Sequence, residues 1–324
     1  MISLEAIKVL QKNMSKSIIG QEKVIERILI VLLGNGNLLL EGLPGLAKTR
    51  AIKSLAKYLD VGLSRIQFTP DLLPSDITGT EIYVSEGNKS EFKFQPGPIF
   101  NNLILADEIN RSPAKVQAAL LEAMEERQIT VAGKTYKLPK PFMVMATQNP
   151  VEQEGTYPLP EAQMDRFLMH VTINYPSDQD EVEILRLVRG EEETTAKKSS
   201  GEIEKIDPEN IFKARDEINK VHVSDAVEKY IVSLISAMRY PDKYNNNLAR
   251  WIDFGASPRG TIALEKCSRV YAWMQGKDFV SPDDVIAIAH DALRHRLILS
   301  YEANADGVTA DKVIDELLNV VAVS

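Results

Sequence analysis

Cysteine, histidine and aromatic residues are scarce in this chain of 324 residues. It contains one cysteine, Cys267, and four histidines, and 6% of its residues are aromatic. A single cysteine excludes an internal disulfide framework and fits a reducing compartment. Only His290 and His295 are close in sequence, and their five-residue spacing does not place them on one helix face. This distribution argues against a histidine-based metal site.

The chain also lacks a long hydrophobic run and an excess of positive charge. The longest apolar run, residues 28–33, is far too short to span a bilayer, and the N-terminal segment has no signal-peptide core. We therefore expect a cytoplasmic protein with no membrane insertion. The formal net charge of −8 disfavours a broad nucleic-acid surface, although local basic patches remain compatible with it.

The length predicts a larger and a smaller domain, because 324 residues exceed the usual size of a single domain. A hydrophobic fraction of 44% and a charged fraction of 26% are ordinary for a globular protein. We expect an α/β domain over residues 1–190, a linker or mobile loop over the polar residues 191–205, and a small helical domain over residues 206–324. Helix starts in this last part are expected at Ser224, Ser257 and Ser281.

Short apolar runs alternate with helical patterns in the first domain. This alternation predicts a parallel β-sheet covered by helices on both faces. The expected strands are residues 37–41, 65–69, 103–106, 142–147 and 168–173. One intervening helix has Ser112 as its expected cap and Pro113 as its first residue.

Two segments interrupt the alternation and are typical of β-hairpins. The first covers residues 81–97 and turns at Glu86-Gly87-Asn88, and the second covers residues 128–138 and turns at Ala132-Gly133. We expect both to project from the surface of the core.

A phosphate-binding loop is indicated between the strand 37–41 and a helix that begins near residue 48. The pattern is Gly, four residues, Gly-Lys, then Ser or Thr, and only Ala47 departs from it. Ala47 keeps its main-chain N–H, and its cost of about 1–2 kcal/mol arises only if its φ is left-handed. The alternative is a Gly-Pro turn that caps a helix. The residues of the expected phosphate cradle are Gly42, Leu43, Pro44, Gly45, Leu46, Ala47, Lys48 and Thr49.

The chemistry of such a loop assigns roles to two side chains. Main-chain N–H groups and the helix N-terminus hold phosphate oxygens. Lys48 would reach the β- and γ-phosphates, and the Thr49 hydroxyl would ligate Mg²⁺. The motif therefore predicts a nucleoside triphosphate with Mg²⁺ as cofactor.

Two carboxylates follow directly after an apolar strand in "NLILADEIN". The carboxyl ends of parallel strands are where ligands bind in α/β sheets. Asp107 can hold Mg²⁺ through water, and Glu108 can orient and deprotonate the attacking water as a general base. The alternative for both is a solvated acidic turn.

The segments "GLPGLAKT", "LILADEIN", "VMATQNP" and "LPEAQMDRF" together resemble the MoxR family of AAA+ ATPases, including the alanine before the lysine. The resemblance covers nearly the whole chain. It implies an AAA+ P-loop core with a central parallel sheet and β-hairpin insertions, followed by a small all-helical lid domain. It also implies ATP and Mg²⁺ as cofactors.

The resemblance assigns roles to three further residues. Asn149 matches the polar sensor near the γ-phosphate, Arg166 the arginine finger directed at the neighbouring subunit, and Arg259 the second sensor arginine of the helical domain. Arg259 near a helix N-terminus costs about 0.3–1 kcal/mol unless an anion is close. The sequence leaves open an Asn-Pro turn at Asn149 and a salt bridge from Arg166 to Asp165 or Glu161.

The same resemblance places Ile18, Ile19 and Gly20 at the adenine pocket, although alone they indicate only a turn before a helix. The two hairpins match the insertions of the helix-2-insert group, which face the central pore or the partner. Tyr136 or Phe92, with neighbouring lysines, could grip a polypeptide there. Exposed amphipathic hairpins explain the pattern equally well.

The resemblance implies an ATPase that forms a homo-oligomeric ring, expected to have six subunits, with nucleotide between the sheet domain and the helical lid. Such a ring would remodel or activate a client protein, as in maturation or metal insertion into metalloenzymes, with a von Willebrand factor A domain protein as partner. The alternatives are a nucleic-acid motor, which the acidic charge disfavours, a chelatase-type motor subunit, and a non-hydrolysing nucleotide switch.

Overall fold

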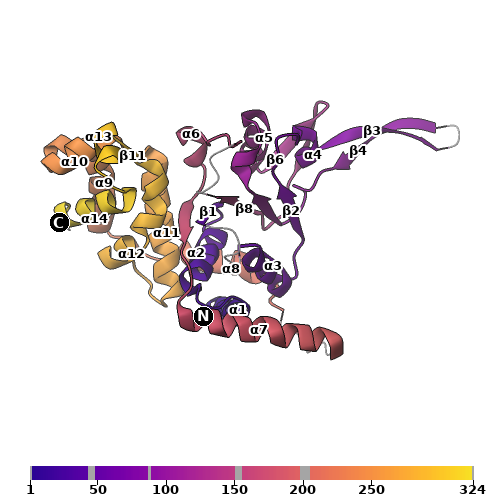
Figure 1. Cartoon of the computed structure of the whole chain (residues 1–324), viewed down its shortest axis with the longest axis horizontal. Coiled ribbons are helices and arrows are strands. Elements are labelled where there is room, and N and C mark those ends of the chain that lie inside the picture. The colour runs from indigo at the N-terminus through magenta and orange to yellow at the C-terminus, as the bar shows by residue number, and fades with distance from the viewer. Residues whose placement is uncertain (1, 43–47, 87–88, 150–154, 198–204, 323–324) are drawn as a thin grey trace.

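A five-stranded parallel sheet forms the centre of the first part of the chain (Figure 1). The computed structural model describes residues 2–42, 48–86, 89–149, 155–197 and 205–322. The strand order is β2-β5-β8-β1-β9, and each strand overlaps its predicted range. The strands are β1 (Leu38–Gly42), β2 (Leu63–Gln67), β5 (Leu103–Asp107), β8 (Met143–Gln148) and β9 (Met169–Ile173). Because all pairs are parallel, every strand ends at one edge, the carboxyl edge, and begins at the other, the amino edge.

The two faces of the sheet are covered by different helices. In β1 the side chains of Leu38 and Leu40 join one hydrophobic cluster and that of Leu39 joins another, as the two-residue period of a strand requires. The first cluster holds α1 (Ile2–Ser17), α2 (Glu22–Leu33) and α3 (Lys48–Leu59). The second holds α4 (Pro74–Thr78) and α5 (Ala114–Glu126). The prediction of a sheet covered on both faces is confirmed.

The start of α5 differs from the prediction. Pro113 is the N-cap, and Ser112 lies before it, after the short 3₁₀ helix η1 (Ile109–Arg111). The Ser112 hydroxyl is buried and has no hydrogen-bond partner among the described residues. The amide of Gln117 instead donates to the carbonyls of Ile109 and Ser112, at 3.2 and 3.1 Å, and thereby satisfies this turn.

Both predicted hairpins are present. They are β3 (Gly79–Glu86) with β4 (Lys89–Pro96), and β6 (Gln128–Val131) with β7 (Lys134–Lys137). Figure 1 shows β3–β4 extending away from the core. Ala132 and Gly133 have φ values of 49° and 80°, as a two-residue turn requires, whereas Gly87 and Asn88 lie outside the described residues. Phe94 stacks on Tyr136 at 4.1 Å between ring centroids, so Tyr136 joins the two hairpins, while Phe92 is exposed.

The helix α7 (Asp178–Lys197) corrects part of the linker prediction. It continues to Lys197, inside the segment 191–205 that we expected to be a linker. Three consecutive glutamates, residues 191–193, and the pair Ala196-Lys197 have high helix propensity, which offsets the two threonines between them and continues the helix. Residues 198–204 are outside the described part, and the proposed domain limits stay predictions. The next helix, α8 (Glu209–Ile218), packs against α1 and α2.

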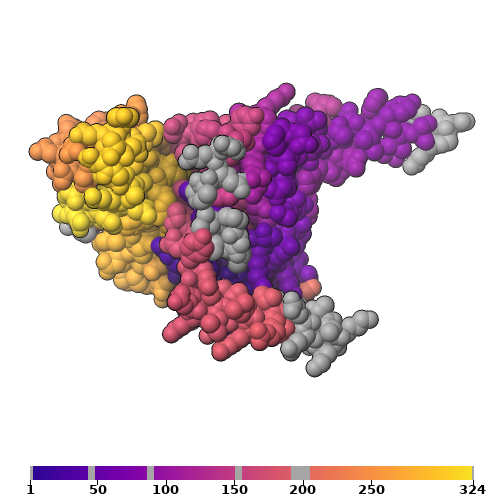
Figure 2. Space-filling view, in the orientation of Figure 1, coloured from indigo at the N-terminus to yellow at the C-terminus, as the bar shows by residue number. Residues whose placement is uncertain are grey.

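The last part of the chain forms a helical lobe beside the core (Figure 2). Ser224, Ser257 and Ser281 are N-caps, as predicted. A small antiparallel sheet of β10 (Ile252–Phe254) and β11 (Ile298–Leu299) was not predicted, because strands this short show no periodicity. The other elements are α9 (Asp225–Arg239), α10 (Asn246–Trp251), α11 (Pro258–Met274), α12 (Pro282–Leu293), α13 (Tyr301–Ala305) and α14 (Ala310–Val320), with α6 (Glu161–Met164) in the core and the 3₁₀ helices η2 (Pro241–Lys243) and η3 (Arg294–Arg296).

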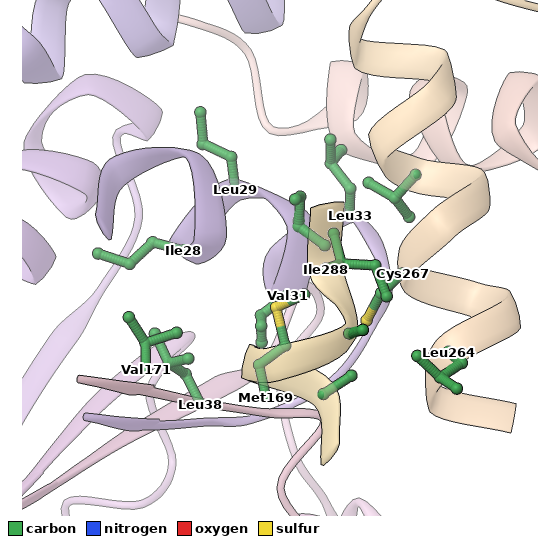
Figure 3. Packing of buried hydrophobic residues seen from close by; sticks show 14 of the residues in the cluster. Ile28, Leu29, Val31, Leu33, Leu38, Met169, Val171, Leu264, Cys267 and Ile288 are labelled. Carbon is green, nitrogen blue, oxygen red and sulfur yellow. The ribbon is translucent and has the colours of Figure 1, made fainter. Parts of the chain in front are cut away.

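One hydrophobic cluster continues from the sheet into this helical lobe, the lid. Figure 3 shows α2, β1 and β9 packed against side chains of α11 and α12. Cys267 lies in this cluster, and burial raises the pKa of its thiol to about 12, so it stays protonated at neutral pH. Within the described residues, the helices are all too short or too polar to cross a lipid bilayer.

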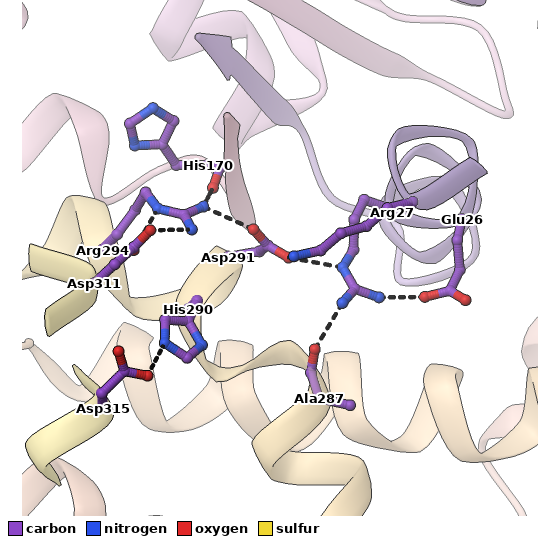
Figure 4. A network of polar contacts seen from close by, with 10 residues as sticks. Glu26, Arg27, His170, Ala287, His290, Asp291, Arg294, Asp311 and Asp315 are labelled. Atoms are coloured by element: carbon purple, nitrogen blue, oxygen red, sulfur yellow. Dashed lines mark hydrogen bonds and ion pairs between the residues drawn. The ribbon is translucent and has the colours of Figure 1, made fainter. Parts of the chain in front are cut away.

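A buried ionic network also joins the lid to the core (Figure 4). Arg27 of α2 donates through Nε to Asp291 of α12 at 2.8 Å. Arg294 donates to the same carboxylate at 2.7 Å, to both oxygens of Asp311, and to the carbonyl of His170 in β9. Burial alone would raise the pKa of Asp291, but Arg294 and Arg27 outweigh it and lower that pKa. The carboxylate is therefore ionised and paired on both sides.

Candidate functional site

The strand β1 and the helix α3 bring the two ends of the predicted phosphate loop together at the carboxyl edge. Lys48 is the first residue of α3, and its Nζ donates to the carbonyl of Gly42 at 2.7 Å. A Cβ at Gly42 would lie 3.0 Å from Ile173 of β9, so this position has little room for a side chain. The predicted cradle residues Leu43, Pro44, Gly45, Leu46 and Ala47 lie outside the described residues and stay a prediction.

Three carboxylates act on the charge of the Lys48 ammonium group. Burial lowers the pKa of Lys48, while Asp107, Glu108 and Glu41 oppose that shift. The predicted acidic pair therefore lies close enough to the loop lysine to act on its charge. Thr49 follows in the first turn of α3 and is half-buried. A lysine, a threonine hydroxyl and carboxylates are the groups that a site for Mg²⁺ and phosphate uses.

Asp107 is held by two neighbouring strands. Its Oδ1 accepts a hydrogen bond from the hydroxyl of Thr147 in β8 at 2.6 Å. Its Oδ2 accepts from Nη2 and Nε of Arg65 in β2 at 2.7 and 3.1 Å. These contacts fix the carboxylate at the end of β5, and the Arg65 side chain is half-exposed.

Glu108 has a left-handed backbone, with φ of 57° and ψ of 51°, which is uncommon for a residue with a side chain. Its N–H donates to the Thr147 hydroxyl at 2.9 Å, and this bond stabilises the turn. Its carboxylate accepts from Nε2 of Gln67 at 2.9 Å and pairs with Arg111 at 3.2 Å. Strained conformations that are held in this way concentrate at functional sites.

Asn149 and the proposed adenine residues lie at the same edge. Asn149 directly follows β8 and is buried, with 7% of its surface exposed. The segment after α1 is tied to the end of β9, because Nε2 of Gln21 donates to the carbonyl of Asn174 at 3.1 Å. Ile18 is buried in the main cluster, so of the three proposed adenine contacts only Ile19 and Gly20 have accessible surface there.

The two predicted arginines meet at the opposite, amino edge. Arg166 precedes β9 and pairs through Nε with Oε2 of Glu125 in α5 at 3.2 Å. Arg259, in the first turn of α11, pairs with the other oxygen of the same carboxylate. They line a cavity of about 320 Å³ between α5, β9 and α11. The anion that we expected near Arg259 is therefore Glu125 in this structure.

Asp165 fixes the lid at this edge. Its Oδ2 accepts a hydrogen bond from the N-cap hydroxyl of Ser257 at 2.6 Å, and its Oδ1 accepts from Nε of the buried Arg296 at 2.7 Å. Asp165 thereby sets the position of α11, and with it Arg259, relative to Arg166. Neither Asp165 nor Glu161 forms the salt bridge with Arg166 that the sequence had left open as an alternative.

This arrangement bears on the expected position of the nucleotide, which stays a prediction. We expected the nucleotide between the sheet domain and the helical lid, with Arg259 of the lid as the second sensor arginine. Lys48 and Asp107 lie at the carboxyl edge, whereas Arg259 and Arg166 pair with Glu125 at the amino edge. The strands between the edges are five or six residues long, about 15 Å or more at 3.3 Å per residue.

Sequence reasoning missed several residues of the site. Arg65 and Gln67 lie at the end of β2, a strand that we had predicted only as part of the sheet. Their polar side chains at the end of an apolar strand could have indicated a role in the site. Thr147 stands two residues before Asn149 in "MATQNP" and gave no separate signal. Glu125 could not be found, because its role depends on how the lid packs.

Both the sheet domain and the helical lid of this chain are similar to known proteins. The ATPase family associated with various cellular activities (AAA) matches residues 37–169, and the AAA lid domain matches residues 247–317. The chaperone MoxR1 of Mycobacterium tuberculosis is 45% identical over 96% of this chain and 80% of its own length. Protein MoxR of Methylorubrum extorquens is 29% identical over 94% of this chain and 91% of its own.

A solved structure supports the same assignment. The crystal structure of a protein from Cytophaga hutchinsonii, designated a candidate ATPase, superposes with a TM-score of 0.90 at 44% sequence identity. The match covers 100% of this chain and 96% of that one. Together with the strand β1 and the helix α3 that flank the predicted loop, these similarities show that the chain belongs to the MoxR family of AAA+ ATPases.

Proposed function

We propose that this protein hydrolyses ATP with Mg²⁺ and that two copies of the chain complete each site. One copy contributes its carboxyl edge and the next copy its amino edge. The observation that carries the proposal is the separation of Lys48, Asp107 and Glu108 from Arg166 and Arg259 on opposite edges of one sheet.

The carboxyl edge fits Mg²⁺ and a polyphosphate. Thr49 and Asp107 offer the hydroxyl and carboxylate oxygens that Mg²⁺ prefers, and Lys48 offers a cation to the phosphates. Bound Mg²⁺ would neutralise charge on the phosphate oxygens. Asp107 would act through water, because Thr147 already donates to its Oδ1.

Glu108 is the proposed general base. It follows Asp107, and its left-handed backbone turns its carboxylate away from the line of the strand. Gln67 and Arg111 hold that carboxylate, so Glu108 has to leave one of them to accept a proton from water. Asn149, at the end of the adjacent strand, would orient this water or contact the terminal phosphate.

Arg166 and Arg259 are proposed to act on the nucleotide of the neighbouring copy. In an isolated chain Glu125 neutralises both, and the carboxylate is exposed enough to be replaced by phosphate oxygens. A head-to-tail contact that repeats in this way forms a ring when the rotation between successive subunits closes. We propose a homo-oligomeric ring, with six subunits as the expected number.

The proposed biological role is chaperone-like remodelling or activation of a protein complex. It rests on the similarity to the chaperone MoxR1 of M. tuberculosis. The proposed partners are a client protein and a von Willebrand factor A domain protein, with metal insertion as one form of maturation. Phe92 and Tyr83 at the outer part of the β3–β4 hairpin are exposed and pack edge to face at 5.3 Å, which makes them candidates for client contact.

Glu108→Gln tests the proposed hydrolysis. The variant should bind ATP with unchanged affinity and lose about 10²–10⁴-fold in turnover, because the amide cannot take a proton. Fluorescent-nucleotide titration and phosphate release measure the two quantities. Lys48→Ala is the matched control and should lose ATP binding itself. Near-normal turnover by Glu108→Gln would remove Glu108 from the proposed role.

A further inference from the structure

A second cavity, of about 470 Å³, lies at the amino edge next to the arginine pair. It is bounded by the end of α5, the segment between β7 and β8, and α8. The proposed function makes no use of it. Its wall is apolar at Leu138, Pro139, Pro141, Phe142 and Phe212, and cationic at Arg127 and Arg215.

The two arginines are half-buried and have only neutral hydrogen-bond acceptors. Arg127 donates to the carbonyls of Phe142 and Asn35 at 2.8 and 3.0 Å. Arg215 donates through Nη2 to the carbonyl of Leu32 at 2.7 Å, and its Nε is buried without a hydrogen-bond partner within the described residues. Over that same part of the chain, neither guanidinium has a carboxylate within salt-bridge distance.

Positive charge accumulates around this cavity. Burial lowers the pKa of both Arg127 and Arg215 to about 10, and for Arg127 the nearby charge of Arg215 adds to the effect. Both arginines also act to lower the pKa of Lys266, where burial is the main cause. Lys137 and Lys140 are exposed residues of the cavity lining, and Glu126 is the one carboxylate among the described residues of that lining. Cations that are removed from water without a counter-charge are unfavourable, and a bound anion would offset that cost.

The chemistry of the lining selects the kind of anion. A guanidinium presents a planar set of donors that matches phosphate oxygens, whereas a lone ammonium acts as a point charge. The volume exceeds what an inorganic phosphate fills, and Phe142 and Phe212 offer apolar surface beside the charges. Each guanidinium lies over one of these rings, with Arg127 5.0 Å from the Phe142 centroid and Arg215 5.7 Å from that of Phe212.

We propose that this cavity binds a small organic molecule that carries a phosphate group, with Arg127 and Arg215 as ligands of its oxygens. The site is distinct from the phosphate loop, because the cavity lies before β1 and β8 at the amino edge, whereas the loop follows β1 at the carboxyl edge. The proposal is independent of ATP hydrolysis at that loop.

Adenosine monophosphate is the probe, in the full-length protein with Lys48→Ala to remove binding at the phosphate loop. Calorimetry should find one molecule bound per chain, with inorganic phosphate weaker and adenosine undetectable. Adding Arg215→Gln should weaken the monophosphate at least about tenfold, which is 1.4 kcal/mol. Lys213→Ala is the matched control, because Lys213 is exposed on the same helix and does not line the cavity. It should leave binding unchanged.

A second variant covers the case in which Arg215→Gln does not fold, which a thermal melt detects. Lys140→Ala removes an exposed cation of the lining and should weaken the monophosphate about threefold. Equal binding before and after these substitutions would overturn the proposal. The proposal would also be overturned if the Arg215→Gln variant lost its oligomers and no monophosphate binding was found. The cavity would then be a contact between subunits.

Discussion

At the carboxyl edge of the sheet three carboxylates act on the charge of one lysine, and two of them also pair with arginines, whereas at the amino edge two arginines share one carboxylate. Asp107, Glu108 and Glu41 act on Lys48 at the first edge. Arg166 and Arg259 share Glu125 at the second. Lys48 and the two arginines lie at opposite edges, so one chain cannot bring them together. The proposal of two copies per site rests on this separation.

The edges also differ in how they are built. The carboxyl edge is assembled from strand ends, and hydrogen bonds between adjacent strands, such as that from Thr147 to Asp107, hold its side chains. The amino edge depends on the lid, because Ser257 and Arg296 must reach Asp165 before Arg259 can approach Arg166. Changes at the lid should therefore affect the arginine edge and spare the phosphate loop.

The largest effect is expected from Arg166→Ala, which removes one of the two arginines at the amino edge. Turnover should fall by about 10³–10⁵-fold if Arg166 is the proposed arginine finger, because such an arginine would neutralise charge on the transferring phosphoryl group. ATP affinity of the isolated chain should be unchanged, since Arg166 is at the opposite edge from Lys48. Phosphate release and nucleotide titration measure the two quantities.

Arg259→Ala is the companion variant, because its guanidinium shares Glu125 with Arg166. A fall in turnover with unchanged ATP affinity of the isolated chain is expected here as well. Loss of ATP affinity in the isolated Arg259→Ala chain would place this arginine over its own nucleotide and contradict the division between the edges.

A smaller effect is expected from Asp291→Ala, which loosens the lid from the core. Removing one partner of a buried ion pair costs about 3–5 kcal/mol in the free energy of unfolding, because Arg27 and Arg294 lose their shared partner. Chemical denaturation measures this quantity. Asp315→Ala is the control, because Asp315 is exposed, pairs only with His290 among the described residues, and should cost less than about 1 kcal/mol.

The same pair predicts the acid sensitivity of the lid. The pKa of Asp291 is lowered in the folded protein, so the stabilisation is present above its unfolded value of about 3.9 and is lost as pH falls through the folded value. Stability should therefore drop below about pH 4 in the parent protein. The Asp291→Ala variant should show a smaller drop over that range, and equal drops would show that other carboxylates dominate.

The smallest effect is expected from Glu125→Gln, which frees both arginines while keeping their positions on the chain. The ion pairs are partly exposed, so stability should change by less than about 1 kcal/mol. Turnover should rise slightly, by less than about fivefold, because the arginines no longer have to leave a carboxylate. A steady-state assay with Glu122→Gln as control measures this. A tenfold loss of turnover in Glu125→Gln would show that Glu125 positions the two arginines for catalysis.

Sequence reasoning recovered what is local in the chain. Apolar runs identified all five central strands, and the paired carboxylates after β5 lie beside Lys48 as their spacing had indicated. Sequence reasoning did not find the residues whose roles depend on packing between distant segments. Glu125 and Asp165 gain their roles only from the lid, and Gln67 reaches Glu108 only because β2 and β5 are neighbours. The helix α7 was not predicted, and it continues into the segment that we expected to be a linker, where three consecutive glutamates favour a helix without an apolar stripe.

The most direct test of the central claim mixes two inactive variants, Glu108→Gln and Arg166→Ala, after subunit exchange into common rings. In such rings about a quarter of the contacts would join an intact carboxyl edge to an intact amino edge if subunits mix at random. The account predicts that ATP turnover reappears on mixing, although each variant alone is inactive. Rings shown to contain both variants that remain inactive would contradict it.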